Sequence, residues 1–167
     1  MKVFIIAALT IDGFIAEQHD QLADWTSKED KQLFVKLTKE AGTMIMGSRT
    51  FKTIGRALPE RQTIVYSREP ESEPIENVTV TSEDPRSLIT RLEQEGVTSV
   101  AICGGASIYT LFLESGLVTD LYITIEPLVF GSGVTLFNKP LLKQFQLASS
   151  EKLNENVILQ HYQILES

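Results

Sequence analysis

The stretch SVAICGGASIYTLFLE, residues 99–114, contains a strand, a tight turn and a helix in direct succession. Ser99–Ile102 is short and apolar, as expected for a strand buried inside a sheet. Cys103 and two glycines form the turn, and Ala106–Glu114 follows as a helix that stops at Gly116. Because a strand that runs into a helix is the repeating unit of parallel α/β sheets, this stretch predicts the fold class.

The same alternation continues on both sides of that stretch. The other expected strands are Val3–Leu9, Thr43–Met46, Gln62–Tyr66, Val78–Thr81 and Leu121–Glu126. The other expected helices run from Thr26/Ser27 to about Lys39, over Thr50–Ile54 and over Pro85–Glu95, and the tail, Gln146–Leu153 and Val157–Leu165, reads as a hairpin. We therefore expect one domain, residues 1–167, with a mixed, mostly parallel central sheet, flanking helices and a C-terminal antiparallel hairpin.

Charge and composition exclude several classes of protein. The chain has 167 residues with 15 basic and 22 acidic side chains, a net charge of -7, which disfavours nucleic-acid binding. Its one cysteine, Cys103, allows no intramolecular disulfide and is typical of a cytoplasmic protein. No apolar run is long enough to span a membrane, so we expect no membrane contact. No exposed apolar stripe indicates a protein–protein interface, so we expect a monomer.

Asp30 stands out in the segment WTSKEDKQLFVKL, residues 25–37. The spacing of the apolar residues puts Leu33, Phe34 and Leu37 on one helical face, and Asp30 falls on that same face. One interpretation is an ordinary acid in the first helical turn, three residues after a Ser27 cap. The other is a part-buried carboxylate that faces a pocket and binds an amide-like heterocycle through paired hydrogen bonds.

Two junctions between a strand and a helix carry glycine. Gly104-Gly105 would let a phosphate approach the backbone at a helix N-terminus, although a plain tight turn explains it as well. Gly47-Ser48-Arg49-Thr50 has the same layout and adds a basic residue. Two such junctions at the carboxyl ends of strands suggest a ligand with more than one phosphate.

The remaining polar and aromatic candidates each have an ordinary structural explanation. Arg61 is either a solvated loop arginine or a bidentate clamp for a carboxylate, and Arg68 is a candidate for an outer phosphate. Thr124 reads as a β-branched strand residue, and Trp25 and Tyr109 as core or rim aromatics. We expect His19 and His161 at the surface, Cys103 to be inert, and no metal site.

Taken together, these segments resemble dihydrofolate reductase along nearly the whole chain. The resemblance is carried by IIAALTIDGFIA, by Trp25, Asp30 and Phe34 at the family's spacing, and by IMGSRTFKTIGRALPERQTIVYSR, ICGGASIYTLFL and DLYITIEP. The run MGxxTF…IGRxLPxR is the most specific part. The resemblance implies the three-layer fold of that family and a reduction of dihydrofolate by NADPH, without a metal.

The resemblance also implies a role for each site residue. Asp30 would bind the pterin and help to protonate its nitrogen 5, Thr124 would orient Asp30, and the loop Glu17–Trp25 would close over the nicotinamide, with Trp25 among the catalytic residues. Ile6, Ala8, Phe34 and Ile54 would wall the substrate, and Arg61 would clamp its glutamate. The implied cofactor contacts are Ala8, Ile15, Gly47, Ser48, Arg49, Thr50, Ser67, Arg68, Cys103, Gly104, Gly105, Ala106, Ser107, Ile108 and Tyr109.

Two departures and two alternatives accompany the resemblance. Ser48 stands where the family usually has a basic residue, so Arg49 and Arg68 would carry the cofactor's phosphates, and the loop before Trp25 is acidic and longer than usual. The segments TIDGFIA and GGASIYTLFLESGLVTDLYITIEPLVFGSG also resemble the reductase domain of riboflavin biosynthesis, which reduces a ribosylaminopyrimidine phosphate. A nucleotide-binding module without catalysis is the alternative from a different class.

Overall fold

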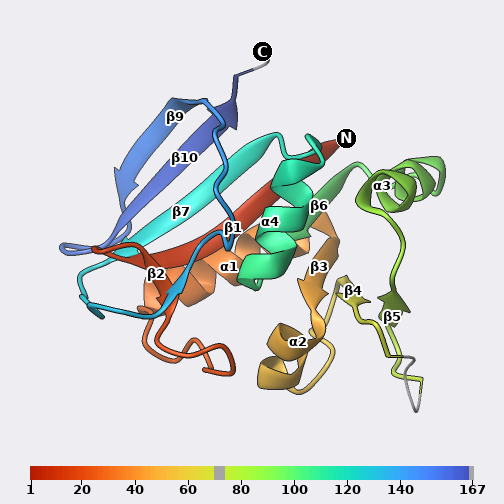
Figure 1. Ribbon diagram of the computed structural model, residues 1–167, viewed down its shortest axis with the longest axis horizontal. Helices are drawn as coiled ribbons and strands as arrows, with labels where there is room; N and C mark the ends of the chain where they lie inside the picture. Colours follow the sequence, from red (N-terminus) through yellow and green to blue (C-terminus); the bar gives the residue numbers. More distant parts are fainter. Residues whose placement is uncertain (70–73, 166–167) are drawn as a thin grey trace.

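The computed structural model describes residues 1–69 and 74–165. The elements are shown in Figure 1. In chain order they are β1 (Lys2–Thr10), β2 (Phe14–Ala16), α1 (Lys28–Ala41), β3 (Thr43–Gly47), α2 (Ser48–Ile54), β4 (Gln62–Tyr66), β5 (Val78–Thr81), α3 (Pro85–Gln94), β6 (Ser99–Ile102), α4 (Ala106–Glu114), β7 (Asp120–Glu126), β8 (Val134–Thr135), β9 (Phe145–Lys152) and β10 (Ile158–Ile164). No helix within the described ranges is long and apolar enough to cross a membrane.

Most of the strands form one mixed sheet. Its 8 strands run in the order β5-β4-β3-β6-β1-β7-β10-β9, and a separate ribbon pairs β2 with β8. The first six strands in this order, β5, β4, β3, β6, β1 and β7, are parallel to one another. In contrast, β10 is antiparallel to both of its neighbours, β7 and β9. The expected mixed, mostly parallel sheet with an antiparallel C-terminal hairpin is confirmed.

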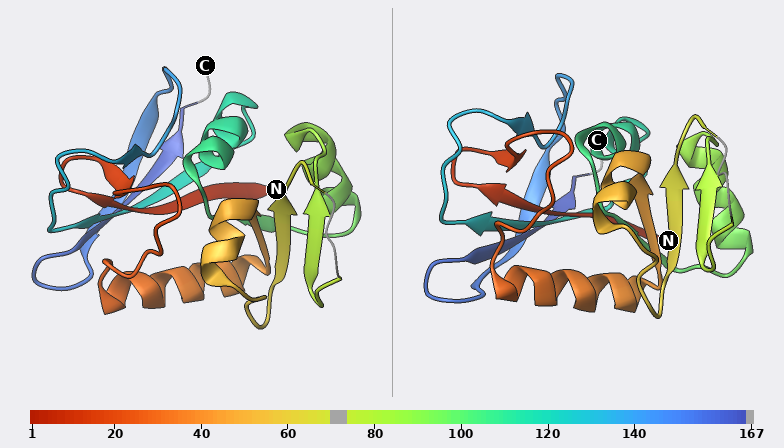
Figure 2. Two further views of the ribbon diagram at one scale, coloured as in Figure 1. Left: turned by 60° about the horizontal axis from the view of Figure 1, so that its bottom comes forward. Right: turned by 90° about the horizontal axis from the view of Figure 1, so that it is seen from below.

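Helices cover both faces of the sheet, which gives three layers. Figure 2 shows α1 along one face and α3 and α4 on the opposite face. Alternate residues of each strand point to opposite faces, so β1 sends Phe4 and Ile6 into the cluster beneath α1 and Val3 and Ile5 into the cluster beneath α3 and α4. A central strand that is buried on both sides must be apolar at every position, which explains the run Val3–Ala7.

Helix α1 begins and ends at the residues that its sequence favours. The Ser27 side chain caps the N-terminus, and Gly42 ends the helix with a φ of 73°, a left-handed conformation that costs glycine little. The cap confirms the expected start, and the helix extends two residues beyond the expected Lys39. Helix α2 likewise begins two residues earlier than expected, directly after Gly47.

Two short strands were not expected from the sequence. β2 lies inside the long segment Thr10–Asp24, for which no strand was expected, and it pairs with β8 with a register shift between Phe14 and Ala16. Asp12 ties these segments together, since its carboxylate accepts hydrogen bonds from the backbone of Phe130 at 3.2 Å and of Gly131 at 2.7 Å. The Pro- and Glu-rich sequence of residues 69–77 predicts an exposed loop, and residues 70–73 of that segment lie outside the described residues.

His161 is not the free surface residue that the sequence suggested. It is half-buried on β10, where its Nε2 lies 2.7 Å from an Asp120 carboxylate oxygen, and its ring stacks on Tyr122 with centroids 4.2 Å apart. Lys2 from β1 donates to the Tyr122 hydroxyl at 2.7 Å. This cluster joins β1, β7 and β10 at the end of the sheet where β1 begins.

Candidate active site

Asp30 lies in the first turn of α1, with its carboxyl group toward β7. Its backbone N–H donates to the Ser27 hydroxyl at 3.2 Å. Burial raises the pKa of the Asp30 carboxyl above its usual range, and hydrogen bonding with the hydroxyls of Thr124 and Thr26 offsets only part of that rise. The backbone of Asp30 thus completes the helix start, as the first interpretation expects, and its carboxyl group is partly buried, as the second requires. Binding of a heterocycle by this carboxyl group stays a prediction.

A second carboxylate, Glu126, lies close to Asp30 and was missed from the sequence. Glu126 ends β7, is only 3% exposed, and accepts hydrogen bonds from the Ser27 backbone N–H at 2.9 Å and the Ser27 hydroxyl at 2.7 Å. Its negative charge contributes to the raised pKa of Asp30. Alternation along LYITIE puts Thr124 and Glu126 on one face of the strand, which is the signal that could have found it.

Apolar side chains of the predicted substrate wall belong to one packed cluster. Ile6, Phe34 and Ile54 all pack in the cluster between the sheet and α1. Ala8 pairs directly with Thr124 across β1 and β7, so the two side chains point to the same face of the sheet. The structure thus brings the acid, its threonine and these wall residues to the same side of the sheet.

Trp25 packs at the end of the long connection that precedes α1. Its ring meets the edge of Phe130, with centroids 5.1 Å apart at an interplanar angle of 71°. Its indole N–H is buried and has no acceptor among the described residues. Phe130 lies in the segment that Asp12 holds, so β1, the Trp25 segment and the segment after β7 meet here. Phe130 was not expected, because its contact is distant in sequence.

Arg61 is buried, which excludes the solvated loop arginine considered above. Arg61 is only 7% exposed. Its Nε donates to the Pro59 carbonyl at 2.8 Å, and its Nη1 donates to the Thr38 hydroxyl at 2.6 Å. Burial lowers the pKa of the Arg61 guanidinium. Two hydrogen bonds fix the plane of the guanidinium, while Nη2 has no acceptor within residues 1–69 and 74–165.

The two glycine junctions lie side by side. The Gly47 N–H donates to the Gly104 carbonyl at 2.8 Å, and a Cβ on Gly105 would lie 3.5 Å from the Thr50 hydroxyl. A cis peptide bond joins Gly104 to Gly105. Neither Gly47, which precedes α2, nor Gly105, which precedes α4, offers a side chain to cap its helix. Backbone N–H groups of two adjacent helix starts are therefore available to an anion.

Other predicted cofactor residues extend from these junctions. Tyr109 is buried and donates its hydroxyl to the Ile6 carbonyl at 2.8 Å, which links α4 to β1. Ala106, Ser107 and Ile108 form the first turn of α4, and Ser48 and Thr50 belong to the first turn of α2. Cys103 is buried at the end of β6, and burial raises the pKa of its thiol, in keeping with an inert side chain.

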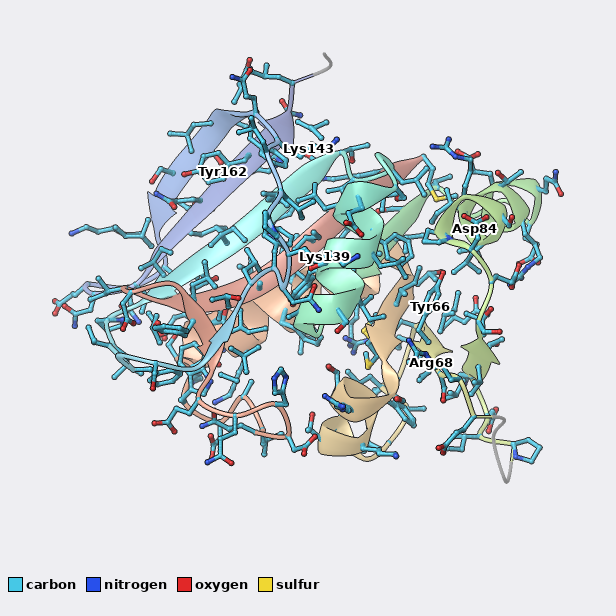
Figure 3. The ribbon with its side chains drawn as sticks, viewed as in Figure 1. Tyr66, Arg68, Asp84, Lys139, Lys143 and Tyr162 are labelled. Carbon is cyan, nitrogen blue, oxygen red and sulfur yellow. The ribbon has the colours of Figure 1, made fainter. Side chains whose placement is uncertain are left out.

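Basic side chains lie beyond the glycine junctions. Gly47 pairs with Tyr66 across β3 and β4, so Ser67 and Arg68, which follow β4, extend past the same edge of the sheet. Figure 3 labels Tyr66 and Arg68 at this end of β4. Arg68 and Arg49 on α2 are both exposed. Ile15 lies on β2 and packs against the cluster beneath α3 and α4.

The fold is that of an α/β protein whose candidate site lies at the carboxyl ends of parallel strands, where open sheets of this class bind ligands. A sequence model of the family described as dihydrofolate reductase matches residues 2–165. The chain therefore belongs to the dihydrofolate reductase family.

Three other proteins are similar to this chain in sequence or in fold. The uncharacterized protein YwjB of Bacillus subtilis (strain 168) is 28% identical over 146 residues, 83% of each chain. A putative riboflavin biosynthesis protein from Shewanella sp. PV-4 superposes with a TM-score of 0.83 at 21% identity, over 99% of this chain and 100% of that one. Dihydrofolate reductase from Enterococcus faecalis, complexed with NADP(H) and RAB-propyl, has a TM-score of 0.75 at 21% identity, over 99% and 97%.

Proposed function

We propose that the protein reduces 7,8-dihydrofolate to tetrahydrofolate with NADPH as the hydride donor. The observation that carries this proposal is Asp30, a part-buried carboxyl group whose pKa is raised by burial, a rise that the Thr124 hydroxyl offsets in part. A part-buried acid at the edge of an apolar wall suits a flat heterocycle with an amino group and a ring amide, which offer paired donors to a carboxylate.

The reduction adds one hydride and one proton to the imine that contains nitrogen 5. NADPH, when bound, supplies the hydride. Asp30 would bind the pterin and keep a proton available near nitrogen 5, since a raised pKa extends the protonated form toward neutral pH. Thr124 would fix the orientation of that carboxyl group, and the Trp25 segment would exclude water from the reacting atoms.

The glycine junctions fit the cofactor. A Cβ on Gly47 would meet Ile108 at 3.1 Å and one on Gly105 would narrow the gap to Thr50, so glycine keeps both helix starts open to a pyrophosphate. Ser48, Thr50, Ala106 and Ser107 would offer the backbone and hydroxyl donors. Arg49 and Arg68 would neutralise the outermost phosphate, which favours NADPH over NADH.

Arg61 favours a substrate with a carboxylate. Its guanidinium is held in one plane by Pro59 and Thr38, and a planar, pre-oriented fork binds a carboxylate in a bidentate way. The glutamate of dihydrofolate provides that group. The apolar surface of Phe34 and Ile54 would lie between Arg61 and Asp30 and would accept the benzoyl ring.

A ribosylaminopyrimidine phosphate is the second candidate substrate. It is favoured by the similarity of this fold to the putative riboflavin biosynthesis protein of Shewanella sp. PV-4. That substrate also presents a pyrimidine with an amide to Asp30, but it ends in a phosphate instead of a glutamate. The two candidate substrates therefore differ most in the group that they would present to Arg61.

The experiment follows NADPH oxidation by purified protein with each substrate in separate reactions, and it includes Asp30→Asn with Glu29→Gln as a matched control. Dihydrofolate should be turned over by the unmutated protein and by Glu29→Gln, and about 100-fold or more slowly by Asp30→Asn, which cannot supply the proton. Turnover of only the pyrimidine would overturn the folate assignment. NADPH binding without turnover of either substrate would indicate a nucleotide-binding module.

A further inference from the structure

Glu126 is a buried carboxylate with no role in the proposed reaction. It is 3% exposed at the end of β7, opposite the buried Thr10 in the pairing of β7 with β1. A buried carboxylate is costly unless hydrogen bonds compensate for the lost water. Here one carboxylate oxygen accepts both the backbone N–H and the hydroxyl of Ser27.

Ser27 connects Glu126 to Asp30 through consecutive hydrogen bonds. The Ser27 hydroxyl donates to Glu126 at 2.7 Å and accepts the Asp30 backbone N–H at 3.2 Å. Glu126 therefore orients the residue that caps α1, and the cap fixes the turn from which the Asp30 side chain projects. Thr124, two residues earlier on the same face of β7, lowers the pKa of that side chain, so β7 acts on Asp30 both through Ser27 and through Thr124.

The charges around Asp30 come from two elements. Glu126 on β7 raises the pKa of Asp30, and Lys31 on α1 lowers it by a smaller amount. Lys31 directs its ammonium group to backbone carbonyls, those of Thr26 at 3.0 Å and Asp24 at 3.4 Å. The negative charge from β7 is thus the stronger of the two influences on the Asp30 carboxyl.

We propose that Glu126 is a positioning residue for Asp30, which holds the first turn of α1 through Ser27 and places a second negative charge behind the Asp30 carboxyl group. The catalytic part of this inference rests on the proposed function. The second charge favours the protonated form of Asp30, and a protonated acid is what the reduction of an imine requires.

The test replaces Glu126 by Gln, which keeps an oxygen acceptor for Ser27 but removes the charge. The matched control is Glu29→Gln, in the same helical turn, where the carboxylate accepts from Asn154 at 3.0 Å. The carboxyl carbon of Asp30 is followed by NMR as the pH is varied. Glu126→Gln should lower the Asp30 titration midpoint by about 0.5–1 pH unit, and Glu29→Gln should leave it in place.

Turnover gives the second measurement. At pH values above the midpoint, Glu126→Gln should react about 3–10-fold more slowly, because less Asp30 is protonated, while the rate at low pH stays that of the unmutated protein. A purely structural role would lower the rate equally at all pH values and leave the Asp30 midpoint unchanged, and that result overturns the proposal. An equal shift in both variants overturns it as well.

Two readouts keep this proposal separate from the assigned reaction. If the protein does not turn over dihydrofolate, the NMR titration still measures the influence of Glu126 on Asp30. If Glu126→Gln does not fold, the Glu126 signal of the unmutated protein is followed instead. That signal should show an inflection at the Asp30 midpoint that disappears in Asp30→Asn, and its absence in the unmutated protein contradicts the proposal.

Discussion

The Asp30 side chain experiences two opposing effects at the start of α1. An acid in the first turn of a helix gains about 0.3–1 kcal/mol from the helix dipole. The pKa of Asp30 is nevertheless raised, because burial and the charge of Glu126 outweigh the hydroxyls of Thr124 and Thr26 and the charge of Lys31. Ionised Asp30 therefore destabilises the folded protein relative to its protonated form.

This balance predicts how stability depends on pH. A carboxyl group with a raised pKa favours folding only while it is protonated, so its contribution is lost as the pH rises from 3.8 through the higher folded value. Asp30→Asn cannot ionise and should melt at a higher temperature than the unmutated protein at pH 7. The difference should close as the pH falls toward 3.8. Thermal melts at several pH values test this, and a lower melting temperature at pH 7 would contradict it.

At the scale of elements, the N-termini of α2 and α4 lie close together at the two glycine junctions of the candidate site. Gly47 and Gly104 share a hydrogen bond, and Ile108 from the first turn of α4 packs against Gly47. Since Gly47 has an ordinary φ of -79°, it is glycine for reasons of space and not of backbone conformation.

Gly47→Ala tests that spacing. The new Cβ would lie 3.1 Å from the Ile108 side chain, so α4 must shift by a few tenths of an ångström. We expect NADPH to bind about 10-fold more weakly, with a loss of about 1 kcal/mol in the free energy of unfolding. Quenching of protein fluorescence by NADPH and urea unfolding measure the two effects. An unchanged dissociation constant would show that the spacing of the two helices does not determine cofactor binding.

At the scale of the whole molecule, the C-terminal hairpin is secured at the far end of the sheet from the site. Asp120 is buried on β7 and bonds Thr119 at 2.6 Å and His161 of β10 at 2.7 Å. Burial alone would raise the pKa of Asp120, but these hydrogen bonds and the charge of Lys2 lower it below 3.8.

The lowered pKa predicts acid-sensitive stability. The contribution of Asp120 is present above pH 3.8 and is lost as the pH falls through the lower folded value. At pH 7, Asp120→Asn should reduce the free energy of unfolding by about 2 kcal/mol, the usual worth of hydrogen bonds to a charged group. Urea unfolding should show this loss at pH 7 and a much smaller one near pH 2. Asp20→Asn, at an exposed position, is the control and should match the unmutated protein at both pH values.

The features that could be predicted from sequence are local ones. Glycine stops, the Ser27 cap and apolar runs lie within a few residues of the elements that they determine, so the sheet and its helices follow from them. The β2–β8 ribbon depends on Asp12 bonding to Phe130 and Gly131, more than a hundred residues away, and neither segment carries a local strand signal.

The same division holds for the candidate site. The alignment of Asp30 with the apolar face is visible in its helix, and the glycine junctions are visible in theirs. Alternation along β7 puts Glu126 on the face of Thr124, but it does not show that Glu126 bonds Ser27 or that His161 bonds Asp120, because these partners are distant in sequence. Arg61 shows a further limit, because burial of a loop arginine depends on Thr38 in a different element.

The position of β1 in the middle of the sheet has a consequence for how the protein folds. Lys2 pairs with Ser99 of β6, and Phe4 pairs with Asp120 of β7. A ribosome makes β1 several seconds before either partner, at about 5–20 residues per second. During that interval the apolar residues of β1 have no neighbouring strands to pair with. We therefore expect chaperones to bind this exposed apolar segment of the nascent chain until β6 and β7 have been synthesised.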